Sequence, residues 1–417
     1  MAQGYASYNI ISSEISFANT PNIDAFGRLR VSEPFTLFDS SHRFDDNGLW
    51  STSTATGGAA TFNAAQGLID LDVTTSSGSE VVRETTKVFS YQPGKSLLVL
   101  NTFVMSTAKA NLRQRIGYYG ANNGYYLEQN GTTVSFVERS FVTGAVVNTP
   151  VAQASWNVDP MDGSGPSGIT LDLTKAQILF MDLEWLGVGT VRVGFIIDGN
   201  FIVCHRFNHA NFITSTYITT ASLPLRYEIT NTGATSGAST LKQICSTVLS
   251  EGGYQLVGLQ QAIGTPVTTP RNLPVAGTFY PIVSIRLKIS PNRLDAIVIA
   301  TAISVVATTS GHYNWQVVAS GTTGAGTWVN APGDSSVQYN ITGTSFTGGR
   351  ILASGFFGVS NQGSTQVDIL KEALFKTQLE RDSFTSTPYE LTILVASDVG
   401  GGGGNVLASM DWEEISR

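Results

Sequence analysis

The chain has 417 residues, a formal net charge of −7 and only 13% charged residues. A nucleic-acid-binding protein needs a basic surface over its phosphate contacts, so this charge argues against nucleic acid as a partner. The 43 glycines, with abundant serine, threonine and asparagine, suit many short strands joined by tight turns. Hydrophobic residues make up 42% of the chain, which is enough for packed cores and excludes wholesale disorder.

A chain of this length exceeds one ordinary hydrophobic core, so two or three domains are expected. We predict an all-β protein with two jelly-roll-like β-sandwiches and an extended N-terminal arm. Three prolines and little periodicity between residues 260 and 274 indicate a linker. The predicted parts are the arm (1–32), a large sandwich (33–255), the linker (256–276) and a C-terminal sandwich (277–417).

The first 32 residues alternate weakly and are expected to pack along a domain or a neighbouring molecule. The N-terminus lacks the basic residues and apolar core of a signal peptide. The longest apolar run, near residues 296–307, is far shorter than the roughly 20 residues that a membrane-spanning helix needs. We therefore expect no membrane insertion.

In the large sandwich, alternating apolar and polar residues predict several strands. The longest such stretch, residues 178–212, contains two or three strands with a hairpin turn at Asp198-Gly199-Asn200, where Gly and Asn tolerate positive φ. We expect this stretch at the centre of the sandwich. Asn130-Gly131, between two alternating runs, is the strongest short hairpin signal. Further strands are predicted at 68–73, 80–90, 96–106 and 225–230, and residues 239–249 suit either a strand or a short helix.

In the C-terminal sandwich, residues 367–379 are the best helical candidate because Leu370, Leu374 and Phe375 fall near one face. The glycine run 400–404 is expected at the tip of a long hairpin. Strands are predicted at 282–289, 294–308, 315–318, 384–397 and 406–415.

Two carboxylates, Asp182 and Glu184, give the sharpest hint of catalysis. Residues i and i+2 of a strand point to the same face, so both could stand over a cleft, with Trp185 and Trp156 available to stack on a sugar. Glycosidases on curved sandwiches add a third acid further along the strand, and residues 186–188 supply none. Ordinary ion pairs, with Arg192 or Arg206 on neighbouring strands, are therefore the favoured interpretation, and no catalytic residue is assigned.

Histidines and cysteines offer little metal or redox chemistry. His205 and His209 are spaced HxxxH, but Arg206 stands where the zincin pattern needs Glu, and His42 and His312 are far away in sequence. We expect His205 and His209 to hold a loop by hydrogen bonds, and we predict no metal or cofactor. The only two cysteines, Cys204 and Cys245, lie among apolar residues and are expected to be buried, reduced thiols.

Four tyrosines flank one predicted hairpin: Tyr118, Tyr119, Tyr125 and Tyr126. If exposed, they could bind carbohydrate or a partner subunit, because tyrosine covers a large area with little loss of entropy. The alternative is cross-strand packing within the sandwich.

Several segments resemble a recurrent module of virion structural proteins from tailed bacteriophages, particularly marine and cyanobacterial ones. They include IDAFGRLRVSEPFTLFDS (23–40), IGYYGANNGYYLE (116–128), DLEWLGVGTVRVGF (182–195), HRFNHANF (205–212), LPLRYEI (223–229) and SEGGY (250–254). QLERDSFTSTPYELTILVASD (378–398) and ASMDWEEIS (408–416) resemble the closing part of the same proteins. The resemblance implies a structural component of the head, neck, tail or fibre, and it brings no catalytic residue.

We therefore expect a non-enzymatic virion component, assembled in the host cytoplasm, whose partners are other copies of itself, with a trimer favoured for a fibre-like part, and other virion proteins. Closed assembly would bury the edges that sheets otherwise expose. The main alternative is a module that recognises host surface glycans at a tail or fibre tip, and a less favoured one is a polysaccharide-cleaving enzyme that uses Asp182 and Glu184.

Overall fold

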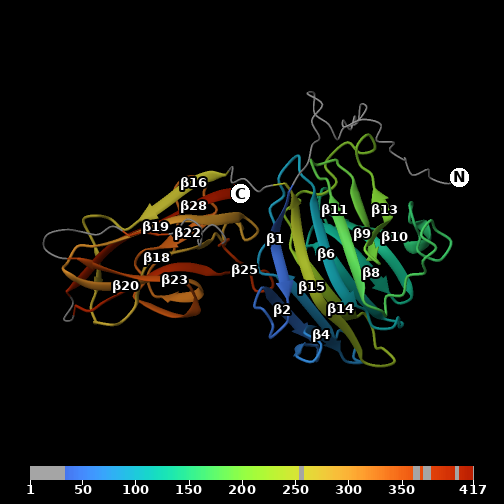
Figure 1. Cartoon of the computed structure of the whole chain (residues 1–417), viewed down its shortest axis with the longest axis horizontal. Coiled ribbons are helices and arrows are strands. Elements are labelled where there is room, and N and C mark those ends of the chain that lie inside the picture. The colour runs from blue at the N-terminus through green and yellow to red at the C-terminus, as the bar shows by residue number, and fades with distance from the viewer. Residues whose placement is uncertain (1–32, 253–257, 360–366, 370–376, 400–402, 417) are drawn as a thin grey trace, which may run out of the picture.

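The computed structural model describes residues 33–252, 258–359, 367–369, 377–399 and 403–416 (Figure 1). The predicted arm (1–32) lies outside the described residues. Within them the only helical element is a 3-10 turn, Gln153–Ser155, and all other elements are strands. No helix in this part of the chain is long and apolar enough to cross a membrane. The predicted all-β fold with two β-sandwiches is confirmed.

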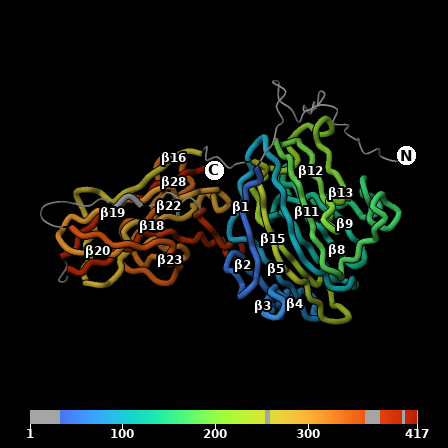
Figure 2. The backbone as a smooth tube through the Cα atoms, in the orientation of Figure 1, coloured from blue at the N-terminus to red at the C-terminus, as the bar shows by residue number. Residues whose placement is uncertain are grey.

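The first sandwich packs an eight-stranded antiparallel sheet against a seven-stranded one (Figure 2). In spatial order the larger sheet contains β13 (Asn200–Phe207), β12 (Val191–Ile197), β11 (Gln177–Leu183), β6 (Leu97–Val104), β15 (Ser239–Glu251), β4 (Leu68–Val73) and β3 (Ala59–Asn63), and β1 (Pro34–Ser41) pairs with β15. The smaller sheet contains β10 (Val147–Ala152), β9 (Thr133–Ser140), β8 (Gly124–Asn130), β7 (Leu112–Tyr119), β14 (Leu225–Asn231), β5 (Glu80–Thr85) and β2 (Trp50–Ala55).

Alternation along the strands produces the core between these sheets. On β6 every second residue is buried, and Leu97, Val99 and Phe103 belong to the same hydrophobic cluster as Tyr227 and Ile229 of β14. Each large apolar side chain that is fully buried contributes roughly 1.5–3 kcal/mol. The sheet is therefore stabilised on its inner face, and its outer face is left for other contacts.

The stretch 178–212 forms β11, β12 and β13, as predicted, but it lies at one end of the larger sheet and not at its centre. β6 and β15 lie in the middle. Alternation shows that one face of a strand is buried, and it does not show how many neighbours the strand has.

Both predicted hairpins are present. β12 and β13 are joined by Asp198 (φ 51°) and Gly199 (φ 76°), so the two residues with positive φ are Asp and Gly, and Asn200 begins the next strand. Positive φ at both loop residues is what a type I′ turn requires. β8 ends at Asn130 and Gly131 (φ 59°) begins the second hairpin.

The second sandwich packs a five-stranded sheet against a six-stranded one. The first contains β16 (Leu259–Gly264), β28 (Gly404–Ser416), β19 (Ile297–Ala307) and β24 (Val367–Ile369), and β17 (Arg271–Leu273) pairs with β28. The second contains β21 (Val329–Asn330), β22 (Val337–Asn340), β18 (Tyr280–Leu287), β27 (Glu390–Ser397), β20 (Gly311–Gly324) and β23 (Ser345–Val359). A small ribbon of β25 (Arg381–Asp382) and β26 (Thr387–Pro388) lies outside both sheets.

Three sequence expectations fail in this sandwich. Part of the predicted linker forms β16 and β17, which pair with β28 because the partner strand, far away in sequence, supplies the hydrogen bonds. Residues 367–369 of the predicted helix form a strand on β19, and residues 370–376 lie outside the described residues. Of the glycine run predicted at a hairpin tip, residues 400–402 lie outside the described residues, and the flanking strands β27 and β28 belong to different sheets and do not pair with each other. In the first sandwich, residues 239–249, for which the sequence allowed a strand or a short helix, form strand β15.

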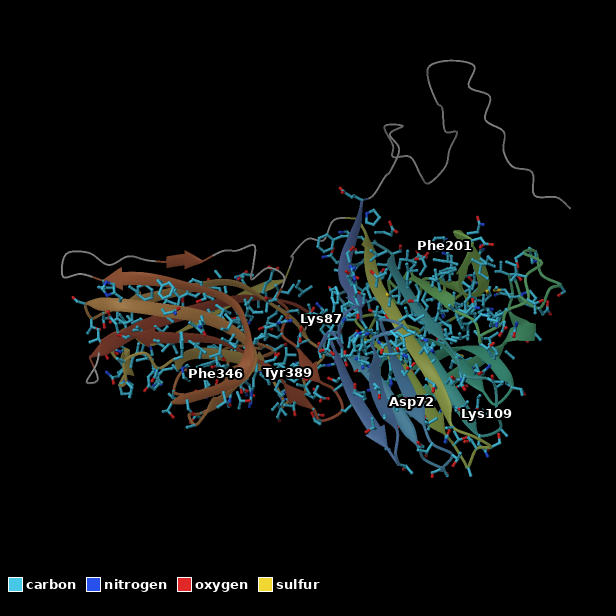
Figure 3. All side chains as sticks on the ribbon, turned by 60° about the horizontal axis from the view of Figure 1, so that its bottom comes forward. Asp72, Lys87, Lys109, Phe201, Phe346 and Tyr389 are labelled. Atoms are coloured by element: carbon cyan, nitrogen blue, oxygen red, sulfur yellow. The ribbon has the colours of Figure 1, made fainter. Side chains whose placement is uncertain are left out.

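The two sandwiches lie side by side and are joined by polar contacts of the β25 region (Figure 1). Arg381, which is 2% exposed, donates to the Thr85 carbonyl oxygen (2.6 Å) and to the Glu84 carboxylate (2.9 Å), and it also pairs with Asp295 (2.9 Å). Val88 of the first sandwich packs with Ile297 and Ile299 of the second. Figure 3 shows Lys87 and Tyr389 beside this junction.

One buried histidine makes the stability of the first sandwich depend on pH. His42 is 1% exposed, and neither ring nitrogen has a hydrogen-bond partner among the described residues. Burial, and secondarily the nearby Arg83 guanidinium, lower its pKa from 6.5 to about 4. Between these values the unfolded chain binds a proton that the folded chain does not, so stability is present above pH 6.5 and is lost as the pH falls towards 4.

We expect the free energy of unfolding to fall by about 1–2 kcal/mol between pH 7 and pH 5 through this residue alone. Urea titrations of the wild type and His42→Leu at both pH values measure it. The leucine variant should lose less stability on acidification, and an equal loss in both proteins would show that His42 does not cause the effect.

Candidate functional site

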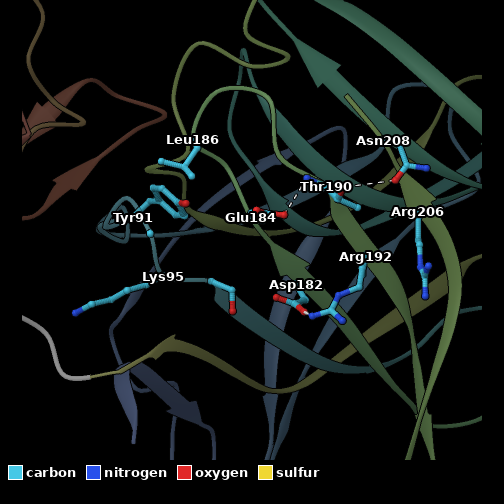
Figure 4. A pocket seen from close by; sticks show the side chains of 11 residues that line it. Tyr91, Lys95, Asp182, Glu184, Leu186, Thr190, Arg192, Arg206 and Asn208 are labelled. Atoms are coloured by element: carbon cyan, nitrogen blue, oxygen red, sulfur yellow. Dashed lines mark hydrogen bonds and ion pairs between the residues drawn. The ribbon is translucent and has the colours of Figure 1, made fainter. Parts of the chain in front are cut away.

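A cleft of about 550 Å³ opens at the end of the larger sheet, on the face opposite the core (Figure 4). Its floor is a cross-strand row in which Asp182 of β11 faces Arg192 of β12, and Arg192 faces Arg206 of β13. The polar cleft is lined by Tyr91, Gly94, Lys95, Ser96, Asp182, Glu184, Leu186, Thr190, Arg192, Arg206 and Asn208.

Asp182 and Glu184 both line the polar cleft, as their i, i+2 spacing predicts. Asp182 is engaged in an ion pair with Arg192, one of its two predicted partners. Glu184 follows the end of β11 and accepts a long hydrogen bond from the Thr190 backbone N–H (3.5 Å). The two acids therefore share a cleft, but they have different partners.

The loop that carries Glu184 is held from below by a buried tyrosine. Tyr217 donates from its hydroxyl to the Glu184 carbonyl oxygen (3.2 Å) and from its backbone N–H to the Gly187 carbonyl oxygen (3.0 Å). Gly189 must be glycine, because a Cβ there would lie 2.2 Å from the Glu184 carbonyl oxygen. One wall of the cleft is thus positioned by backbone contacts.

His209 joins this loop to the opposite sheet. Its Nδ1 donates to the Gly189 carbonyl oxygen (2.6 Å), and its Nε2 lies 2.7 Å from the Glu138 carboxylate. Glu138 also accepts from the Tyr125 hydroxyl (2.5 Å), and the imidazole stacks on Tyr217 with ring centroids 3.9 Å apart. The predicted loop-holding role of His209 is confirmed.

His205 also holds a loop by a hydrogen bond. Its Nδ1 accepts a hydrogen bond from the Asn157 backbone N–H (3.2 Å), and its ring packs edge-on against Phe207. Within the described residues there is no group of three or more His, Cys, Asp or Glu side chains that could hold a metal ion.

The hairpin tyrosines are not available to a ligand, contrary to the hypothesis that they are exposed. All four are at most 1% exposed, and Tyr119 packs on Tyr126 across the hairpin with ring centroids 4.5 Å apart. The alternative, cross-strand packing, is confirmed. Their polar hydroxyls are compatible with burial because each finds a partner; the Tyr118 hydroxyl, for example, donates to the Ala221 carbonyl oxygen (2.7 Å).

The two tryptophans proposed for sugar stacking also lie elsewhere. Trp156 is 5% exposed and stacks in the core on Phe136, with centroids 4.5 Å apart. Trp185 is half-buried and packs edge-on against Tyr91, which itself lines the polar cleft. Tyr91 is therefore the aromatic side chain that this cleft offers.

An aromatic surface that was not predicted from the sequence lies beside the polar cleft. A hollow of about 260 Å³ adjoins it, shares Asp182 and Arg192 with it, and is otherwise lined by Leu98, Phe180, Phe201, Val203 and Glu251. We call these residues the aromatic end, and the two hollows together the groove. Because side chains alternate along a strand, Phe180 lies on the same outer face as Asp182, two residues further on. The i, i+2 argument used for Asp182 and Glu184 could therefore have predicted the position of Phe180.

Gly194 shapes the aromatic end. It faces Phe180 on β11 and Val203 on β13, and a Cβ there would lie 2.9 Å from the Phe180 ring and 1.9 Å from the Ile202 carbonyl oxygen. The ring of Phe180 packs edge-on against Phe201, with centroids 5.1 Å apart. Phe180 is buried while Phe201 remains 55% exposed at the surface (Figure 3), so Phe201 is the exposed ring.

Only one of the two cysteines is buried. Cys204 is buried as predicted, but Cys245 is exposed. A β-bulge in β15 between Gln243 and Ser246 causes this difference: Gln243 points inward, and after the bulge Ser246 does so, which leaves Cys245 outside. Alternation read from the sequence cannot detect such an insertion.

Comparison with known proteins yields no family. No protein-family model and no curated protein matches the chain. Among solved structures, the Emp47p carbohydrate recognition domain aligns at 12% identity over 55% of this chain and 99% of its own, with a TM-score of 0.33. Peanut lectin aligns at 12% identity over 54% and 100%, with a TM-score of 0.32. A family 16 endo-glucanase from Bacteroides ovatus aligns at 12% identity over 51% and 99%, with a TM-score of 0.34. Likenesses this low carry no functional argument.

Gly194→Ala should destabilise the first sandwich by about 1–3 kcal/mol, because the added methyl group overlaps the β13 backbone. Calorimetric melting of the wild type and the variant measures this loss. Gly237→Ala is the matched control, since its Cβ would meet only Lys109 Nζ at 3.9 Å. Equal melting temperatures for the two variants would contradict the close approach at Gly194.

Proposed function

We propose that the chain is a non-enzymatic glycan-binding protein and that the groove is its binding site. The observation that carries this proposal is the junction, at Asp182 and Arg192, of a polar cleft with an aromatic end. A sugar ring has hydroxyl groups at its rim and apolar C–H faces. It therefore needs hydrogen-bonding groups and an apolar ring surface side by side, and the groove provides both.

The size and rigidity of the groove support the proposal. Ligand sites commonly measure about 300–1,000 Å³, and the polar cleft falls within that range at about 550 Å³. Its floor consists of paired strands, and its wall is held by His209 and Tyr217. Groups that are positioned before the ligand arrives lose little entropy on binding.

Binding without cleavage fits the state of the two acids. Asp182 forms an ion pair with Arg192, and its position on a paired strand maintains this contact. In this ion pair the Asp182 carboxylate already has a guanidinium donor as its partner. Both acids then serve as hydrogen-bond acceptors for ligand hydroxyls.

Phe201→Ala should weaken glycan binding by at least about tenfold, because it removes the exposed ring of the groove. A glycan array followed by calorimetric titration of the strongest hit measures the change. Phe44→Ala is the control, since Phe44 is 82% exposed but does not line the groove. Retained affinity in Phe201→Ala would refute this site. Release of reducing sugar by the wild type that is lost in Asp182→Asn would refute the non-enzymatic role.

A second candidate function, homo-oligomeric assembly within a tailed-phage virion, is supported by an edge strand as well as by the sequence resemblance. β23 is 15 residues long and lies at the edge of its sheet, with Ile351 54% and Phe356 79% exposed. A long edge strand with exposed apolar residues is a template for pairing with another chain. A second copy of β23 would satisfy it by symmetric strand addition.

If β23 pairs with a second copy, Phe356→Asp should convert the oligomer to monomer, because each interface would bury two carboxylates without partners. Light scattering coupled to size exclusion measures the mass. Val329→Asp, on the opposite edge strand β21, is the matched control and should keep the wild-type mass. A monomeric wild type at high concentration would reject assembly through β23.

A further inference from the structure

Two arginines face each other on the floor of the polar cleft. Arg192 and Arg206 are directly opposite on β12 and β13, and both line the cleft. Like charges in this arrangement destabilise a sheet unless another group offsets them. Asp182 offsets one of them through its ion pair with Arg192.

The Arg206 guanidinium has no such partner. Its backbone N–H donates to Asn157, but within the described residues its side chain makes no hydrogen bond and no ion pair. Figure 4 shows it beside Arg192, with the Asn208 side chain nearby. Five guanidinium N–H groups are therefore available at the edge of the cleft.

The other charged side chains that line the cleft do not cancel the positive charge of Arg206. Lys95 adds a positive charge, and its ammonium group donates to Gln92 (2.9 Å). Glu184 adds a negative charge on the opposite wall, where it accepts from Thr190. The lining thus contains three cationic and two anionic side chains. Glu251 lies at the aromatic end, in the hollow that Arg206 does not line.

We infer that the ligand of the groove is an acidic glycan whose carboxylate binds Arg206. This inference rests on the proposed glycan-binding function and specifies its ligand class. The planar guanidinium matches a carboxylate with two parallel hydrogen bonds, a geometry that a single ammonium group cannot provide. The sugar that bears this carboxylate lies in the polar cleft, and the glycan chain continues over Phe201.

The net charge of −7 does not prevent this binding. At physiological ionic strength, charges more than about 8 Å apart are largely screened, so the local excess at Arg206 decides the interaction with a bound carboxylate. The acidic surface elsewhere slows the approach of an acidic glycan, and added salt weakens both effects.

The test is an array of oligosaccharides in matched pairs, in which uronate or sialic-acid carboxylates are free or methyl-esterified, with sulfated oligosaccharides as a third arm. The full chain is compared with Arg206→Gln and with Arg43→Gln, a change at an exposed arginine outside the groove. We expect binding to free carboxylates, weakened about tenfold or more by esterification and by Arg206→Gln, and unchanged in Arg43→Gln.

The outcomes separate the two proposals. Equal binding of free and esterified glycans that depends on Phe201 would overturn the acidic ligand and keep the glycan-binding function. Preference for sulfated over carboxylated glycans would overturn the carboxylate assignment. Binding to no oligosaccharide in any arm would overturn the glycan-binding function, and the acidic ligand with it. Circular dichroism of Arg206→Gln, an outer-face change that leaves the core intact, verifies that it is folded.

Discussion

The groove depends on one buried contact, the imidazole of His209 between the Gly189 carbonyl oxygen and the Glu138 carboxylate. Glu138 belongs to β9 in the smaller sheet, whereas Gly189 lies in the loop between two strands of the larger sheet. A partly buried carboxylate without hydrogen bonds would be unfavourable, so His209 and the Tyr125 hydroxyl together stabilise it in this position. This network holds the two sheets and the wall of the cleft in one arrangement.

The outer face of the larger sheet can carry a site because the inner face supplies the stability. The core residues of β11 and β12, such as Leu179 and Val193, are fully buried, while Asp182 and Arg192 on the same strands point outward. Substitutions on the outer face therefore change the lining of the groove without opening a cavity in the core. The aromatic end depends on glycine at position 194, because a Cβ on Gly194 would crowd the Phe180 ring.

The two sandwiches meet through buried charge at Arg381. This guanidinium is surrounded by the Glu84 carboxylate, the Asp295 carboxylate and the Thr85 carbonyl oxygen. Removing the Glu84 carboxylate would leave the Arg381 guanidinium, whose side chain is 3% exposed, with the exposed Asp295 as its remaining ion-pair partner, and a buried charge that loses a partner is strongly destabilising. The junction thus fixes how the sandwiches are arranged, and it leaves both the groove and the β23 edge exposed on the described surface.

Several features could be predicted from the sequence alone. The period of two identifies most strands, because every second side chain must enter a core, and β4 coincides with the predicted residues 68–73. Asp198-Gly199-Asn200 and Asn130-Gly131 predict two hairpins, because Gly and Asn tolerate positive φ, and in the structure Asp198, Gly199 and Gly131 adopt it. The i, i+2 spacing correctly places Asp182 and Glu184 in one cleft.

Only the tertiary structure decided which strands are neighbours and which aromatic side chains are exposed. The hairpin tyrosines and Phe201 are all aromatic, but Tyr118 and Tyr125 face the core, Tyr119 and Tyr126 are covered by arginine side chains of their own sheet, and Phe201 is exposed. β16, β17 and β24 form because distant partners supply their hydrogen bonds, and the bulge in β15 turns Cys245 outward. A local pattern reports which face of a strand is apolar. Sheet order and the register between strands that are distant in sequence depend on residues far away along the chain.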